Sequence, residues 1–73
     1  MTVKQEFLPG DPVMVTGLSW LGDLRGTVVE TGPWWEPGYP APHEPVPGVR
    51  VADETGRTAW HARRNIEEVS LWN

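Results

Sequence analysis

The sequence predicts an all-β domain built as a five-stranded small barrel, and three observations support this prediction. Short runs rich in β-branched residues recur along the chain, each bounded by glycine, proline or aspartate. No stretch has the 3.6-residue apolar period of a long helix. The chain has 73 residues and no cysteine, so one domain must build its core without a disulfide or a cysteine-bound zinc.

The first two strands are placed by their turn residues. The cluster Pro9-Gly10-Asp11-Pro12 breaks the chain and is followed by the alternating β-branched run 13–16, which is the first predicted strand. The second predicted strand covers residues 25–31. Within it, Gly26 marks either a bulge or a close approach of another backbone segment.

The C-terminal third predicts the remaining three strands. Residues 49–52 and 57–61 form a hairpin around the turn 53–56, in which glycine can supply a positive φ. Residues 62–65 have the length of one helical or 3₁₀ turn. The last predicted strand follows at residues 66–71.

Between the second and third strands the composition changes. Residues 32–48 contain six prolines, in part with P-x-x-P spacing. Because proline fixes φ and lacks a backbone donor, we expect this segment to stay outside the ladder as a loop with polyproline II character. It could serve as a stiff loop, as a ligand for another groove, or as a cover over this protein's own aromatic patch, which would allow self-association.

The order of these elements resembles that of a Src-homology-3-like (SH3-like) barrel: a medium first loop, a long second loop, a tight third hairpin and one 3₁₀ turn before the fifth strand. We expect residues 1–8 to form an N-terminal arm and residues 9–73 to form the single barrel. The expected core consists of Val13, Val15, Val28, Val49, Val51, Ile66 and Val69.

The segment Phe7 to Val15, followed by Gly26-Thr27-Val28, resembles the start of the KOW motif of ribosomal and transcription-elongation proteins. In this chain the loop between the two parts is longer than in that pattern, and Arg25 is the one basic residue in it. The resemblance implies a module that contacts RNA, the ribosome or RNA polymerase. Its contacts would come from the C-terminal arginines Arg50, Arg57, Arg63 and Arg64.

A second resemblance covers nearly the whole chain. The segments 7–15, 26–28, 47–51 and 65–69, with Ser19-Trp20 in the first loop, resemble small accessory barrels of electron-transport enzymes. These include the small accessory barrel of photosystem I, the variable chain of ferredoxin–thioredoxin reductase and the C-terminal barrel of the nitrile hydratase β chain. The resemblance implies a non-catalytic module that docks on or stabilises a larger protein partner, although one fold serves many functions.

Net charge bears on the kind of partner. The chain carries six Lys and Arg against ten Asp and Glu, a formal net charge of −4. Nucleic-acid binding depends mainly on basic contacts to phosphate, so this balance disfavours a nucleic-acid partner and favours a protein. The alternative of ordinary surface ion pairs for the arginines stays open.

The aromatic residues are the main candidates for a binding surface. Five tryptophans are many for 73 residues, and fitting all of them into one core would be difficult. Because the first loop and the Pro-rich loop flank one surface in an SH3-like barrel, we expect a protein-binding site there. Its candidate residues are Trp20, Trp34, Trp35, Tyr39 and Trp60. The alternative is that they pack the long loop onto the barrel.

No pattern of catalytic residues is present. His43, Glu44 and His61 do not have the spacing of a zinc site, and Ser19 and Ser70 have no neighbouring histidine. We therefore expect no enzymatic activity, no metal and no cofactor. The N-terminus has no apolar run and no stretch could span a bilayer, which predicts a cytoplasmic protein without a membrane partner.

Overall fold

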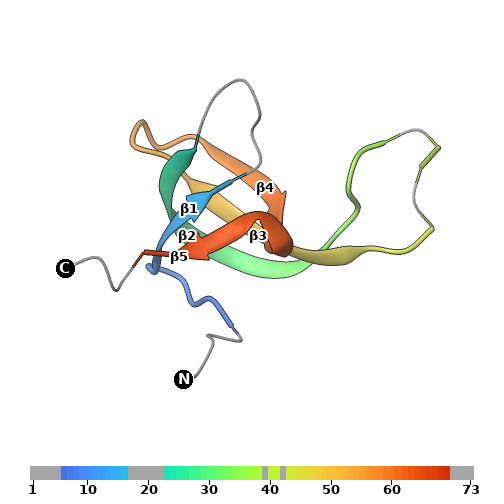
Figure 1. The fold of residues 1–73 in the computed structure, drawn as a ribbon, viewed down its shortest axis with the longest axis horizontal. Helices are drawn as coiled ribbons and strands as arrows, with labels where there is room; N and C mark the ends of the chain where they lie inside the picture. Colours follow the sequence, from blue (N-terminus) through green and yellow to red (C-terminus); the bar gives the residue numbers. More distant parts are fainter. Residues whose placement is uncertain (1–5, 17–22, 39, 42, 70–73) are drawn as a thin grey trace.

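The computed structural model describes residues 6–16, 23–38, 40–41 and 43–69, which form one five-stranded antiparallel sheet (Figure 1). The elements are β1 (Pro12–Val15), β2 (Leu24–Trp34), β3 (Val46–Ala52), β4 (Thr58–Ala62), the 3₁₀ turn η1 (Arg63–Asn65) and β5 (Ile66–Glu68). Neighbouring strands lie in the order β4-β3-β2-β1-β5. The predictions of an all-β chain, five strands and one 3₁₀ turn before the last strand are confirmed.

The core lies on one face of this sheet. Six of the predicted residues are buried there: Val13, Val15, Val28, Val49, Val51 and Ile66. Val69, expected with them, is half-buried just beyond β5. Phe7, Met14 and Ala62 are buried in addition. None of the three described tryptophans is part of this core, so valine provides most of it.

The segment before β1 is attached to β2 by its backbone. The N–H of Gly10 donates to the carbonyl of Val28 at 2.8 Å, and the N–H of Val28 donates to the carbonyl of Asp11 at 2.9 Å. The Asp11 carboxylate accepts the N–H of Leu8, also at 2.9 Å. These bonds hold Phe7 against the core at 7% exposure. Residues 6–8, expected in an arm before the barrel, therefore include one core side chain.

Gly26 marks a close backbone approach, as expected from its place inside a strand. A Cβ at this position would lie 2.5 Å from both the carbonyl oxygen of Ala52 and Cγ1 of Val51. The irregularity in the ladder lies further along β2, where the register shifts between Val28 and Glu30. Val29 is the extra residue and its side chain is exposed.

The prediction that residues 32–48 stay outside the ladder is wrong at both ends of this segment. β2 continues to Trp34 and β3 begins at Val46, with Pro33 opposite Pro47. Two opposed prolines fit only a pair that exchanges no N–H···O bonds, and antiparallel ladders provide such a pair at every second position. The hairpin thus continues beyond the other strands as a projecting arm (Figure 1). Residues 35–45 connect its two strands.

The tight turn between β3 and β4 forms as predicted, with Gly56 at φ +88°. Asp53 organises this turn, because one of its carboxylate oxygens accepts the N–H and the hydroxyl of Thr55 and the N–H of Arg57. The hydrogen bond from the Thr55 hydroxyl is the main cause that lowers the pKa of Asp53, and both backbone N–H bonds act in the same direction.

Strand pairing does not close the sheet into the expected barrel. Within the described part of the chain, β4 and β5 are the two ends of the sheet and share no ladder. η1 leads from one to the other within three residues, and β5 is itself only three residues long, with β1 as its partner. No helix in the described ranges is long and apolar enough to cross a membrane.

Candidate functional site

Trp34 and Trp60 come together on the face of the sheet opposite the core. A Cβ at Gly48 would lie 2.5 Å from the Cβ of Trp34 and 3.2 Å from Cε3 of Trp60. Glycine at this position therefore lets the two side chains approach from β2 and β4 over the middle of β3. We call the surface of Trp34, Gly48, Trp60 and Arg50 the outer aromatic face.

Arg50 is held beside Trp60 by its neighbours on both sides. The register places Arg50 between Glu30 on β2 and Trp60 on β4. Its Nη1 donates to the Glu30 carboxylate at 2.9 Å, while its Nε and Nη2 donate to the Thr58 hydroxyl at 3.2 and 3.0 Å. This exposed ion pair contributes little stability, roughly 0–1 kcal/mol. Its main effect is to fix the orientation of the guanidinium group.

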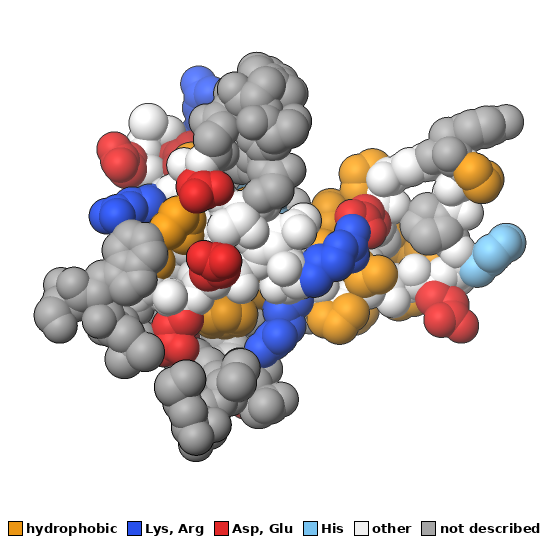
Figure 2. Space-filling model, in the orientation of Figure 1, with side chains coloured by type: hydrophobic (Ala, Val, Ile, Leu, Met, Phe, Trp, Pro, Cys, Tyr) orange, Lys and Arg blue, Asp and Glu red, His pale blue; other side chains and the backbone are white. Residues whose placement is uncertain are grey.

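Of the other three predicted aromatic residues, the structure describes Trp35 alone. Trp35 follows β2 and is 58% exposed, so it is a surface residue as expected for at least one tryptophan. Trp20 and Tyr39 lie outside the described residues. Figure 2 shows hydrophobic side chains exposed along the projecting arm. The aromatic set is therefore divided between the outer aromatic face and the arm.

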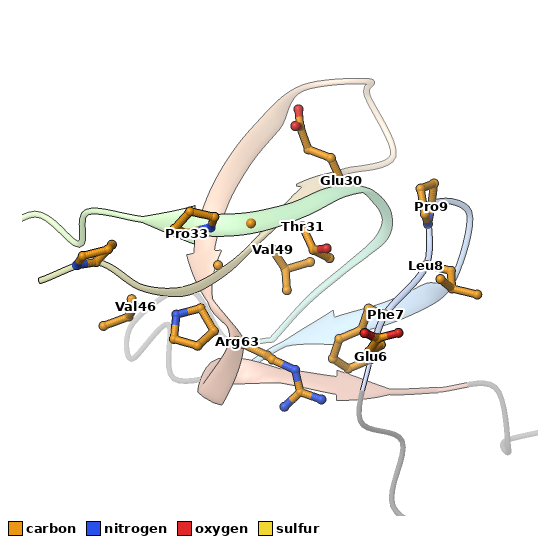
Figure 3. Close-up of a pocket in the computed structure, with 14 residues that line it drawn as sticks. Glu6, Phe7, Leu8, Pro9, Glu30, Thr31, Pro33, Val46, Val49 and Arg63 are labelled. Atoms are coloured by element: carbon orange, nitrogen blue, oxygen red, sulfur yellow. The ribbon is translucent and has the colours of Figure 1, made fainter.

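A groove of about 790 Å³ lies on the opposite side of the arm, and sequence reasoning did not predict it (Figure 3). It is lined by residues 6–9, 30–33 and 45–49 together with Arg63. The Arg63 guanidinium carbon lies 5.2 Å from the centroid of the Phe7 ring, a cation–π contact at one side of the groove. We call this feature the inner groove.

The four arginines of the RNA-binding hypothesis do not form one patch. Arg50 lies on the outer aromatic face, Arg57 follows the β3–β4 turn, and Arg63 contacts Phe7. Arg64 forms an ion pair with Glu36 at the start of the 35–45 connection. On the face shown in Figure 2, acidic side chains lie among the basic ones. Contact with RNA or RNA polymerase stays a prediction.

Burial shifts the pKa of His61. It lies on β4 opposite Val49, and its buried Nε2 atom has no hydrogen-bond partner in the part of the chain that the structure describes. Desolvation disfavours the charged ring and lowers the pKa below 6.5. His43, by contrast, is exposed in the connection between β2 and β3.

The His61 shift predicts a pH-dependent stability. Because protonation is harder in the folded state, the unfolded state binds more protons below pH 6.5. The unfolding free energy is therefore highest above pH 6.5 and falls as the pH drops through that value toward the lower folded pKa. Urea unfolding of the wild type and of His61→Gln at pH 7.5 and 5.5 measures this effect. A similar pH response in both proteins would contradict the assignment.

The described His, Asp and Glu side chains are poorly arranged to bind a metal ion. In those ranges, no group of three or more His, Asp or Glu side chains is arranged to hold a metal ion. The two histidines lie on different elements, one in the connection 35–45 and one in β4. The expectation that the chain needs no metal or cofactor stays a prediction.

Comparison of the chain with family models, curated proteins and solved structures finds no match in any of the three. Its function must therefore be inferred from its own residues. The two surfaces described above, the outer aromatic face and the inner groove, are the features from which such an inference can start.

Proposed function

We propose that this chain is a non-catalytic protein-interaction module that docks on or stabilises a larger partner through the outer aromatic face. The observation that carries the proposal is that the side chains of Trp34 and Trp60 both lie against Gly48. Arg50, held by Glu30, lies beside Trp60. Tryptophan and arginine are the residue types that most often dominate the free energy of protein–protein binding. Here both are held by a ladder and not by a loop, so little conformational entropy is lost on docking.

We also propose that the module is an SH3-like small barrel. The strand order, with β1 between β2 and β5 and with β4 at the far end, supports this assignment, as does η1 before β5. In this proposal the partner contacts Trp35 in addition to the outer aromatic face, and Trp20 and Tyr39 extend the contact. Enzymatic activity and a cofactor have no part in it, and a cytoplasmic location remains the expectation from the sequence.

Two arginine substitutions on neighbouring residues of β2 test which face the partner uses. A Cβ on Gly32 meets nothing within 4 Å, so Gly32→Arg adds a large charged side chain to the outer side at little cost in stability. Thr31→Arg adds the same side chain to the inner groove, because successive strand residues point to opposite faces. The two variants therefore add the same side chain at neighbouring positions of one strand and on opposite faces, while the backbone of Gly32 itself belongs to the lining of the inner groove.

We expect Gly32→Arg to weaken partner binding at least about tenfold, a change of about 1.4 kcal/mol, while Thr31→Arg binds like the wild type. The partner is first captured from a native lysate on immobilised wild-type protein, and its dissociation constants for the three chains are then measured in purified form. Loss of binding with Thr31→Arg alone would contradict the assignment of the outer aromatic face. So would equal binding by all three chains.

A further inference from the structure

Strand β2 has an unpaired edge where the arm projects from the sheet. β1 pairs with residues 24–27 of β2, and Gly10 and Asp11 add two backbone hydrogen bonds to Val28. At Gly10, which has φ +95°, the chain before β1 turns out of this line. Among the described strands, none pairs with residues 30–33 of β2 on the side away from β3. We call residues 30–33 the open edge of β2.

The backbone N–H and C=O of Thr31 point out of the sheet at this open edge. Pro33 lies opposite Pro47, and these two residues exchange no N–H···O bonds because neither has an N–H. Bonded and non-bonded pairs alternate along an antiparallel ladder. Thr31, two residues before Pro33 and opposite Val49, is therefore also in a non-bonded pair, and its backbone groups face away from β3.

The ladder on the other side of β3 gives the same direction. The N–H of Asp53 donates to the carbonyl of Arg57 at 2.8 Å, so this pair is a bonded one at the end of the β3–β4 ladder. Val49 lies four residues before Asp53, so by the same alternation it bonds to β4 and not to β2. The open edge therefore offers the N–H and C=O of Thr31 and the C=O of Pro33.

The inner groove runs along this open edge. Thr31 and Pro33 line it from the arm, and Leu8 and Pro9 line it from the segment before β1 (Figure 3). Its volume of about 790 Å³ lies within the range of about 300–1,000 Å³ that is usual for ligand sites. Domains that bind a peptide as an added strand have this arrangement, in which backbone hydrogen bonds give affinity and the groove receives every second side chain.

We infer that a partner protein inserts an extended segment into the inner groove and pairs it antiparallel with the open edge of β2. Such a segment continues the line of β1, which is itself antiparallel to β2. The inference goes beyond the proposed function and does not rest on it, because the outer aromatic face lies on the other face of the sheet.

The geometry of the open edge defines the chemistry of this segment. One of its residues lies opposite Thr31 and exchanges two backbone hydrogen bonds with it, and a second lies opposite Pro33 and donates to its carbonyl. Both side chains then point to the groove face, where Pro47 and Val49 form part of the lining. Alternate residues of the segment should therefore be apolar.

Charge favours basic residues at the positions between them. The groove is lined by two acids, Glu6 and Glu30, and one base, Arg63, and the chain has a formal net charge of −4. A second copy of the chain would bring the same net charge and a second Pro33, which has no N–H to donate across the edge. A segment of another protein with alternating apolar and basic residues fits better, and salt should weaken its binding.

Isothermal titration calorimetry with the synthetic peptide acetyl-Lys-Val-Lys-Val-Lys-Val-Lys-amide tests the inference on the purified full chain. We expect binding to the wild type with a dissociation constant below about 1 mM, and at least about tenfold weaker binding to Thr31→Pro, which has no N–H at the edge. The proline removes no hydrogen bond of the β2–β3 ladder, since Thr31 makes none there. Thr31→Val keeps the N–H and the branched shape and should bind like the wild type.

Methylated forms of the peptide test the pairing without any change in the protein. The valines that face the groove are also the residues that bond to the open edge, so N-methylation of the valines should abolish binding. N-methylation of the lysines, whose N–H groups face away from β2, should leave it intact. No binding of the unmodified peptide at 1 mM, a level at which about half of the sites should be filled, would overturn the inference. Equal binding of both methylated peptides would overturn it too, as would equal binding by Thr31→Pro and Thr31→Val.

Two further measurements separate this inference from the other readings of the groove. Trp60→Ala, on the outer aromatic face, should lose the partner of the proposed function and keep the peptide, whereas Thr31→Pro should do the reverse. In analytical ultracentrifugation, a wild-type dimer that Thr31→Pro dissociates would assign the open edge to a second copy and contradict the inference. Circular dichroism establishes that each variant is folded. Should Thr31→Pro fail to fold, the methylated peptides still decide the matter, because they use the wild-type chain.

Discussion

Replacing Gly26 with alanine is expected to lower the free energy of unfolding by about 2–3 kcal/mol. The added methyl group would lie 2.5 Å from the carbonyl oxygen of Ala52 and from Cγ1 of Val51. The valine side chain is buried and the carbonyl belongs to β3, so relief of the overlap requires the ladder between β2 and β3 to separate locally. Alanine gains about 0.5–1 kcal/mol of backbone entropy relative to glycine, which is too little to compensate.

Gly32 provides the matched control for this prediction. It lies on the same strand, has an ordinary negative φ, and a Cβ there meets nothing within 4 Å. Gly32→Ala should therefore leave stability unchanged or raise it by up to about 1 kcal/mol, because the unfolded chain loses conformational freedom. Urea unfolding followed by tryptophan fluorescence compares the two variants. Equal stability of Gly26→Ala and Gly32→Ala would contradict the close approach of β3 to Gly26.

The strands and the core could be predicted from the sequence because both depend on local signals. Alternating valines between turn residues mark the strands, and the inward positions of those strands are the residues found buried. Gly56 takes the positive φ that its turn requires. Phe7 was missed as a core residue because it precedes the first turn cluster. Only the hydrogen bonds from Gly10, Asp11 and Val28 carry it back onto the sheet.

The two surfaces could be predicted only in part, since they depend on register. The high tryptophan content makes Trp34 and Trp60 candidates for a binding surface. Their approach to one another depends on Gly48, which lies between them on β3. The inner groove depends on Pro33 facing Pro47 in a ladder position that needs no donor. Proline content alone indicates a loop, and the sequence holds no local signal for that register. In the described residues β4 and β5 share no ladder, and this too is a property of the whole sheet.

Substitution of Phe7 by alanine should cause the largest loss of stability, about 3–5 kcal/mol, because it removes a buried aromatic ring from the core. The ring is 7% exposed, belongs to the same cluster as Val13 and Val49, and also carries the Arg63 guanidinium at 5.2 Å. For a domain of this size, a loss of about 3 kcal/mol corresponds to a decrease in Tm of more than about 10 °C. Thermal unfolding followed by circular dichroism measures it.

Leu8→Ala is the control, because the leucine is adjacent to Phe7 but 58% exposed, and it should change stability by less than about 0.5 kcal/mol. The comparison decides whether the segment before β1 belongs to the folded unit. A chain cut immediately before Pro9 should lose as much stability as Phe7→Ala, because it too removes the ring from the core. If the shortened chain unfolds at the wild-type temperature, residues 6–8 are a dispensable arm, and the wall they form in the inner groove is not part of the stable fold.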